Sequence, residues 1–107
     1  MVGGDRNLTV YVELSATYAR YVQLAKNPEL LIAGAVTRAD GLVTSADVEW
    51  PDGQPGTYTP TYSAAFPGAV DSYTITHGSP VTETYTQPAI TRDSTGAAIN
   101  VTQIVVS

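Results

Sequence analysis

LLIAGAVTRADGLVTSADVEW, residues 30–50, contains two extended runs joined by a two-residue turn. The runs, Leu30 to Arg38 and Leu42 to Trp50, are rich in the aliphatic and β-branched residues that favour strands. Asp40-Gly41 between them is the turn chemistry that a two-residue hairpin requires. This stretch therefore predicts a β-hairpin and indicates a β-rich fold.

The chain beyond this hairpin alternates short extended runs with turns. Loops rich in Gly, Pro and Asp are expected at Pro51 to Gly56, around Pro67-Gly68, at His77 to Pro80 and at Asp93 to Gly96. The extended runs between them are Thr57 to Ser63, Val70 to Thr76, Val81 to Thr86, Gln87 to Arg92 and Ala97 to Val106. We therefore expect a mainly β fold, a small β-sandwich or barrel of about eight short strands.

The N-terminal part contains one more predicted strand, Leu8 to Ser15. Apolar and polar residues alternate strictly along it, so that Leu8, Val10, Val12 and Leu14 share one face. A face of this kind is normally placed against a core. We expect Trp50 and at least two of Leu8, Val10 and Val12 to be buried.

A helix is credible only in the window 15–31. Tyr18, Tyr21, Val22 and Ala25 lie at i, i+3, i+4 and i+7, behind Ser15 as a candidate N-cap. Asn27-Pro28 would end the helix or open a turn. The same residues also fit an extended strand pair, and the sequence leaves both alternatives open.

Length and composition limit the class of protein. A chain of 107 residues predicts a single domain, residues 1–107, in which folding hides roughly two-thirds of the unfolded surface. The absence of cysteine excludes disulfides, thiolate metal sites and a cysteine nucleophile. The formal net charge is −5 and the five cationic residues are dispersed, which argues against nucleic-acid binding.

No apolar run approaches the roughly 20 residues that span a bilayer, and the start, Met1 to Asp5, lacks the features of a secretory signal. No membrane insertion is therefore expected. We expect the chain to fold in the cytoplasm of the cell that makes it.

The only histidine, His77, lies in a predicted turn. No second histidine supports a nucleophile–His–acid set, and metal binding by His77 with Asp71 or Glu83 would need partners that spacing does not supply. We expect a structural or solvent-facing role for His77, whose replacement by alanine should leave function intact. We predict no catalytic residue, no cofactor-binding residue and no metal ligand, and hence no enzyme.

Three of the ten carboxylates, Asp40, Asp52 and Asp93, are followed by a glycine within three residues. An aspartate in that position usually caps a turn through its side chain, and this interpretation is favoured over glycosidase or calcium chemistry. Tyrosines and one tryptophan offer a second candidate chemistry, a platform that stacks on sugar rings. These residues, which are commoner as half-buried strand positions, are Trp50, Tyr58, Tyr62, Tyr73 and Tyr85.

Three phrases carry a resemblance to a known family: VEWPDGQPGTYT (48–59), FPGAVDSY (66–73) and YTQPAITRD (85–93). They resemble segments of small virion proteins, notably minor tail proteins, of tailed phages that infect actinobacteria. The resemblance covers roughly residues 8 to 107. It implies a non-enzymatic virion structural protein, made in the bacterial cytoplasm and assembled in several copies at the tail tip. No functional residue is carried over, because the phrases are strand-and-turn segments.

Two alternatives come from other classes. One is a capsid decoration protein that cements the shell, and the other is a carbohydrate- or receptor-binding β module whose partner would be a host surface glycan. For the structural protein we expect partners among other virion proteins and copies of itself. The contacts are expected at the glycine-containing start, Met1 to Asn7, and at the loop Pro51 to Gly56.

Overall fold

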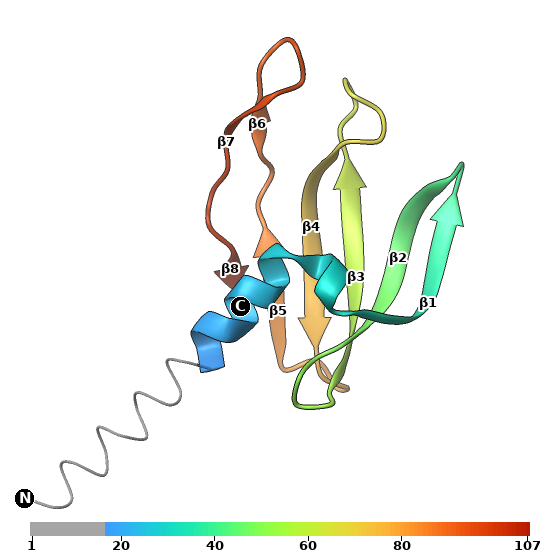
Figure 1. Cartoon of the computed structure of the whole chain (residues 1–107), viewed down its shortest axis with the longest axis vertical. Helices are drawn as coiled ribbons and strands as arrows, with labels where there is room; N and C mark the ends of the chain where they lie inside the picture. The colour runs from blue at the N-terminus through green and yellow to red at the C-terminus, as the bar shows by residue number, and fades with distance from the viewer. Residues whose placement is uncertain (1–16) are drawn as a thin grey trace, which may run out of the picture.

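A six-stranded antiparallel sheet organises residues 17–107, the part of the chain that the computed structural model describes (Figure 1). The strand order is β1-β2-β3-β4-β5-β8, and β6 and β7 form a separate two-stranded pair. The strands are β1 Ile32–Ala39, β2 Leu42–Glu49, β3 Pro55–Tyr62, β4 Val70–His77, β5 Glu83–Gln87, β6 Thr91–Arg92, β7 Ala98–Asn100 and β8 Val105–Val106. The predicted mainly β fold with about eight short strands is confirmed.

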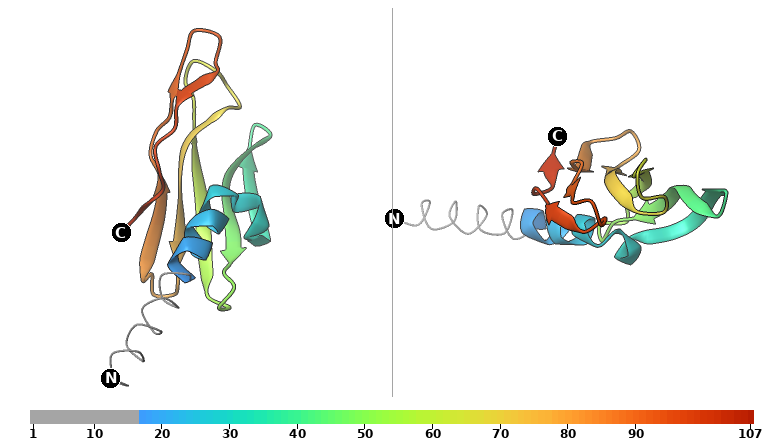
Figure 2. Two further views of the ribbon diagram at one scale, coloured as in Figure 1. Left: turned by 60° about the vertical axis from the view of Figure 1, so that its left-hand side comes forward. Right: turned by 90° about the horizontal axis from the view of Figure 1, so that it is seen from above.

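Within the described residues 17–107, helical structure occurs only in the predicted window 15–31. Residues 17–26 form an α-helix and η1, Pro28–Leu30, is a 3-10 turn, so the extended alternative for this stretch is wrong. The predicted strand Leu8 to Ser15, the Ser15 cap and the burial of Leu8, Val10 and Val12 lie outside the described residues. The helix and η1 lie on one side of the sheet (Figure 2).

The hairpin of β1 and β2 forms as predicted, and its turn is Asp40-Gly41 with φ of 53° and 81°. The first strand begins at Ile32 rather than Leu30, because the 3-10 turn continues until Leu31 N–H donates to the Pro28 carbonyl. Gly34, with φ of 117°, marks a register shift where Ala35 N–H donates to Asp47 Oδ2 at 3.3 Å. A bulge of this kind makes an edge strand less receptive to further strands along its length.

A row of inward-facing side chains crosses five strands and forms the floor of the core. The cross-strand partners in this row are Ala46, Tyr58, Ile75, Tyr85 and Val106. The helix places Ala25, which is completely buried, over this row, with Tyr21 and Val22 packed beside it. Packing an amphipathic helix on one sheet face is the usual way to remove both apolar surfaces from water.

Trp50, predicted to be buried, is 1% exposed and lies between the helix and the sheet. Its ring stacks on Tyr21 at a centroid distance of 5.3 Å and approaches Tyr85 at 4.8 Å. Its indole N–H donates to the Thr76 carbonyl at 2.9 Å. That carbonyl is free for the indole because Thr57 N–H bonds the hydroxyl of Thr76 instead.

The opposite sheet face is lined with hydroxyl side chains. Next to the buried row runs an outward row of Asp47, Thr57, Thr76, Thr84 and Ser107. Side chains alternate between the two faces of a strand. The threonine side chains next to the buried row in β3, β4 and β5 therefore face outward, whereas Tyr58, Ile75 and Tyr85 face the core.

Candidate functional site

His77 joins a loop and a turn that are far apart in the sequence. Its Nε2 lies 2.8 Å from Asp52 Oδ2, and its Nδ1 lies 3.0 Å from the Thr82 hydroxyl. Its ring also packs edge-on against Trp50, and the residue is 8% exposed. Asp52 thus connects the Pro51–Gly56 loop to the His77–Thr82 turn.

This arrangement contains the residue types of a hydroxyl–His–carboxylate set, which the sequence did not place together. The Thr82 hydroxyl lies 3.1 Å from the carbonyl of His77, so it bonds within its own turn. A catalytic hydroxyl instead gives its proton to histidine while it attacks a bound substrate. The three side chains therefore form a hydrogen-bonded latch between two turns.

The other carboxylates suggested as metal partners of His77 are engaged elsewhere. Asp71 pairs with Arg92 at 2.8 Å, and Glu83 accepts a hydrogen bond from the Tyr85 hydroxyl at 2.7 Å. Within residues 17–107, no group of three or more His, Asp or Glu side chains is placed to hold a metal ion. No helix in that range is long and apolar enough to span a membrane.

The predicted turn role is visible for Asp52 and Asp93. Asp93 Oδ1 accepts hydrogen bonds from the Thr95 hydroxyl and from the backbone N–H groups of Thr95 and Ala97, and these bonds lower the pKa of Asp93. Burial opposes ionisation of Asp52, but the hydrogen bonds from Gln54 N–H and His77 outweigh it and lower the pKa of Asp52. Both groups are therefore stabilised as carboxylates by their turns.

The aromatic residues divide into two groups. Trp50 and Tyr85 are buried under the helix, whereas Tyr58, Tyr62 and Tyr73 are half-buried beyond its C-terminal end. The Tyr73 hydroxyl donates to the Ala25 carbonyl at 2.7 Å, and burial raises the pKa of Tyr73 to about 12. Tyr58 and Tyr73 lie with ring centroids 5.4 Å apart, tilted at 55°.

The sheet forks where these tyrosines lie. β2 and β3 pair only from Ala46↔Tyr58 to Glu49↔Pro55, so the first half of β2 and the second half of β3 are not paired with each other. Figure 1 shows the β1–β2 hairpin leaning away from β3 toward its tip. Tyr62 bridges the fork, because its hydroxyl donates to the Val43 carbonyl at 2.8 Å.

A groove of about 500 Å³ occupies this fork on the helix side of the sheet. Its volume falls within the roughly 300–1,000 Å³ of typical binding pockets. It is lined by Lys26, Pro28, Glu29, Ile32, Val43, Tyr58, Tyr62, Val70, Asp71, Tyr73, Gln87, Ile90 and Val101. Most of these side chains are aliphatic or aromatic, so the groove is an apolar surface.

Two apolar residues on the lining of the groove stay exposed. Val101 is 59% exposed and Ile32 is 37% exposed. Single exposed aliphatic residues are normal, but a cluster around an apolar groove marks a binding surface. Composition did not reveal this groove, because its residues come from every part of the chain between Lys26 and Val101.

Ile90 and Val101 of the groove lining flank the β6–β7 pair, and Arg92 of β6 anchors this pair to β4. Arg92 donates to Asp71 Oδ1 at 2.8 Å, to the Gly96 carbonyl at 2.8 Å and to the Val70 carbonyl at 3.0 Å. Ile90 N–H also donates to the Asp71 carbonyl. These bonds fix the long hairpin against β4, so the groove has a preformed wall.

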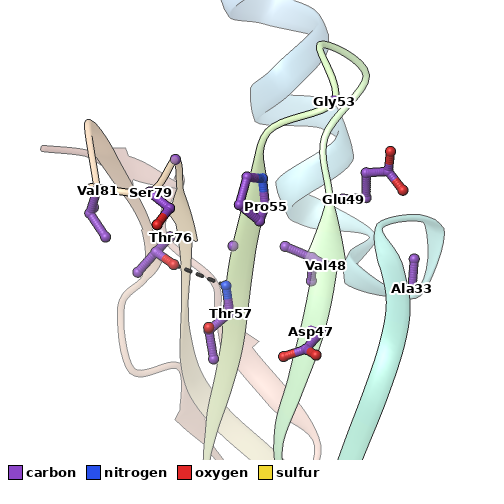
Figure 3. A pocket seen from close by; sticks show the side chains of 12 residues that line it. Ala33, Asp47, Val48, Glu49, Gly53, Pro55, Thr57, Thr76, Ser79 and Val81 are labelled. Atoms are coloured by element: carbon purple, nitrogen blue, oxygen red, sulfur yellow. Dashed lines mark hydrogen bonds between the residues drawn. The ribbon is translucent and has the colours of Figure 1, made fainter.

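A second hollow, of about 510 Å³, lies mainly on the hydroxyl-lined side (Figure 3). Asp47, Glu49, Thr57 and Val81 are among its lining residues, together with Gly53 and Pro55 of the loop predicted to make contacts. Among residues 17–107, no lysine or arginine lines this hollow. Its two carboxylates and scattered hydroxyls do not converge on one point in the way that a built ligand site requires.

Comparison with known proteins found no relative: no family model, no curated protein and no solved structure matches this chain.

Proposed function

We propose that this chain is a non-enzymatic structural protein that assembles with other proteins through the groove in the forked sheet. The carrying observation is the groove itself, an apolar hollow whose rim residues Ile32 and Val101 stay exposed. Burying such a surface against a partner gives roughly 25 cal/mol per Å². Assembly is therefore the use to which this part of the molecule is best suited.

The resemblance of residues 48–59, 66–73 and 85–93 to minor tail proteins suggests the kind of assembly. We propose a virion component, most readily at the tail tip, with other particle proteins and copies of itself as partners. A capsid decoration protein would use the same kind of surface, and it differs in its place on the particle. A labelling experiment that locates the chain on the particle would therefore distinguish a tail protein from a capsid decoration protein.

One observation favours a second candidate, a carbohydrate-binding module: three tyrosines line the groove. Against this, the Tyr62 and Tyr73 hydroxyls are bonded to main-chain carbonyls, and the rings of Tyr58 and Tyr73 contact each other. A sugar platform needs open ring faces and free polar edges. The bonded hydroxyls and contacting rings therefore favour a structural role for the tyrosines in shaping the groove over stacking on sugar rings.

The test uses charge placed on the groove rim of the full-length chain. Val101→Asp should abolish incorporation into particles, because a buried unpaired carboxylate opposes docking. Val81→Asp is the matched control, since Val81 is 56% exposed and lies outside the groove. Purified particles would be probed with an antibody against the chain, and electron microscopy of labelled particles would distinguish tail from head.

Normal incorporation of the Val101→Asp chain, with its melting temperature unchanged, would contradict assembly through the groove. Binding of the purified chain to a glycan array, lost in Tyr58→Ala, would support the carbohydrate-binding module instead.

A further inference from the structure

The helix covers only part of the sheet face on which it lies. Its last residue, Lys26, and η1 reach the edge of the groove, and the groove beyond them is lined by strands and by the 88–101 segment. In one common mode of recognition, an extended segment binds beside a strand and places every second side chain in a hollow. An apolar groove in a forked sheet suits that mode of binding. The occupant should therefore be an extended segment with one apolar face.

We propose that the occupant is the segment Leu8 to Ser15 of a second copy of this chain. This inference rests on the proposed function and names the partner. Along Leu8 to Ser15 the residues alternate so that Leu8, Val10, Val12 and Leu14 face one way. Four aliphatic side chains on one strand face complement the aliphatic lining at Ile32, Val43, Val70, Ile90 and Val101.

Helix geometry favours a second copy over the same chain. Residues 17–26 run from a hollow lined by Thr17 and His77 to the groove at Lys26, about 15 Å for ten residues. Thr17 therefore lies at the end of the described helix that is remote from the groove. Leu14 and Val12 come three and five residues before Thr17 in the sequence, and eight extended residues span at most about 29 Å. Within one chain, only the Leu8 end of the segment could therefore reach the groove. A second copy can place all four aliphatic residues, Leu8, Val10, Val12 and Leu14, in it.

The first half of β2 offers main chain to such a segment, except at the Val43 carbonyl, which accepts the Tyr62 hydroxyl. Residues Leu42 to Ser45 of β2 pair with β1 and not with β3. On the other side of the fork, Pro60 of β3 has no N–H to donate. The docked segment should therefore run along β2, with its apolar side chains directed into the groove.

The experiment uses the absence of native cysteine. Full-length Val10→Cys and full-length Val101→Cys chains are mixed and oxidised, and the covalent dimer is quantified by gel and mass spectrometry. We expect a heterodimer yield several-fold above two controls. One control replaces Val10→Cys with Thr9→Cys, on the opposite strand face, and the other replaces Val101→Cys with Val81→Cys, outside the groove.

A second measurement keeps the inference independent of cysteine reactivity. Native mass of the unmodified chain should show concentration-dependent oligomers, and Val12→Asp should remove them while Tyr11→Asp should not. The far-ultraviolet spectrum of each variant reports whether residues 17–107 stay folded.

Equal yields in all three mixtures would overturn the inference. So would a doubly substituted Val10→Cys/Val101→Cys chain that forms only an intrachain disulfide at every concentration, because the segment would then fill its own groove. If crosslinking fails but Val101→Asp still blocks incorporation into particles, the groove binds another protein, and only the inference is lost. If both experiments fail, the proposed function is lost with it.

Discussion

The inner face of the sheet has two halves that use aromatic residues differently. Under the helix, Trp50 and Tyr85 are each 1% exposed. The Trp50 ring contacts the rings of Tyr85, His77 and Tyr21. At the fork, Tyr58 and Tyr73 form a half-buried pair beside an open groove. The first half holds the domain together, whereas the second keeps an apolar surface available.

The largest expected effect is in the closed half. Trp50→Ala should reduce the free energy of unfolding by about 3–5 kcal/mol, because it empties the space between helix and sheet and removes the donor to the Thr76 carbonyl. Val101→Ala in the open half should change it by less than about 0.5 kcal/mol, because Val101 is 59% exposed. Urea unfolding of both variants checks the contrast, and equal losses would abolish the distinction between the halves.

Gly56 offers a sharper test of close packing in the closed half. An added Cβ at Gly56 would lie 1.8 Å from the Thr76 carbonyl oxygen, which accepts the Trp50 indole. Gly56→Ala should therefore cost about 1–3 kcal/mol or more. Gly53→Ala is the matched control, since nothing lies within 4 Å of its added Cβ and only its positive φ of 82° opposes the change. Thermal melts should rank Gly56→Ala as the less stable variant.

Tyr73 links the two halves, and its ionisation should make the fold sensitive to alkali. Burial raises the pKa of Tyr73 to about 12, above the value near 10 of an unfolded chain. The Tyr73 hydroxyl therefore stays protonated to higher pH in the folded state than in the unfolded chain. Its contribution to the free energy of unfolding is complete below pH about 10 and is lost as pH rises through about 12.

Tyr73→Phe should be less stable at neutral pH by about 0.5–1.5 kcal/mol, because the bond to the Ala25 carbonyl is lost. The difference from the natural chain should shrink above pH about 10. Urea titrations at several pH values would measure it, and a constant difference would mean that Tyr73 does not carry the alkaline transition.

A smaller effect than that of Tyr73→Phe is expected at the hydrogen bond that bridges the fork. Tyr62→Phe removes the hydroxyl that donates to the Val43 carbonyl, at a cost of about 0.5–1 kcal/mol because a half-buried site lets water replace it. Hydrogen exchange should become faster in Leu42 to Ser45 and stay unchanged in the closed half. Faster exchange throughout the sheet would show that the fork is not a separate element.

Local patterns predicted much of this fold but little of the candidate site. The Asp40-Gly41 turn and the burial of Trp50 followed from short-range sequence rules and are confirmed. The window 15–31 was open to a helix or a strand pair, and the structure has a helix at residues 17–26. The groove could not be predicted, because its lining combines residues separated by up to 75 positions, from Lys26 to Val101. Tyr62 and Tyr73 were noted as aromatic candidates, but their carbonyl partners depend on pairing across the sheet.

The sequence by itself determined where the main turns and extended runs lie and in which window a helix could form, because alternation, turn residues and helical periodicity act over a few neighbouring residues. Tertiary structure alone decided which of these meet. The Asp52–His77 latch spans 25 residues and the Tyr73–Ala25 bond spans 48, and neither has a local signal. The fork between β2 and β3 likewise exists only once both strands are paired, because register and twist depend on long-range contacts that no short pattern encodes.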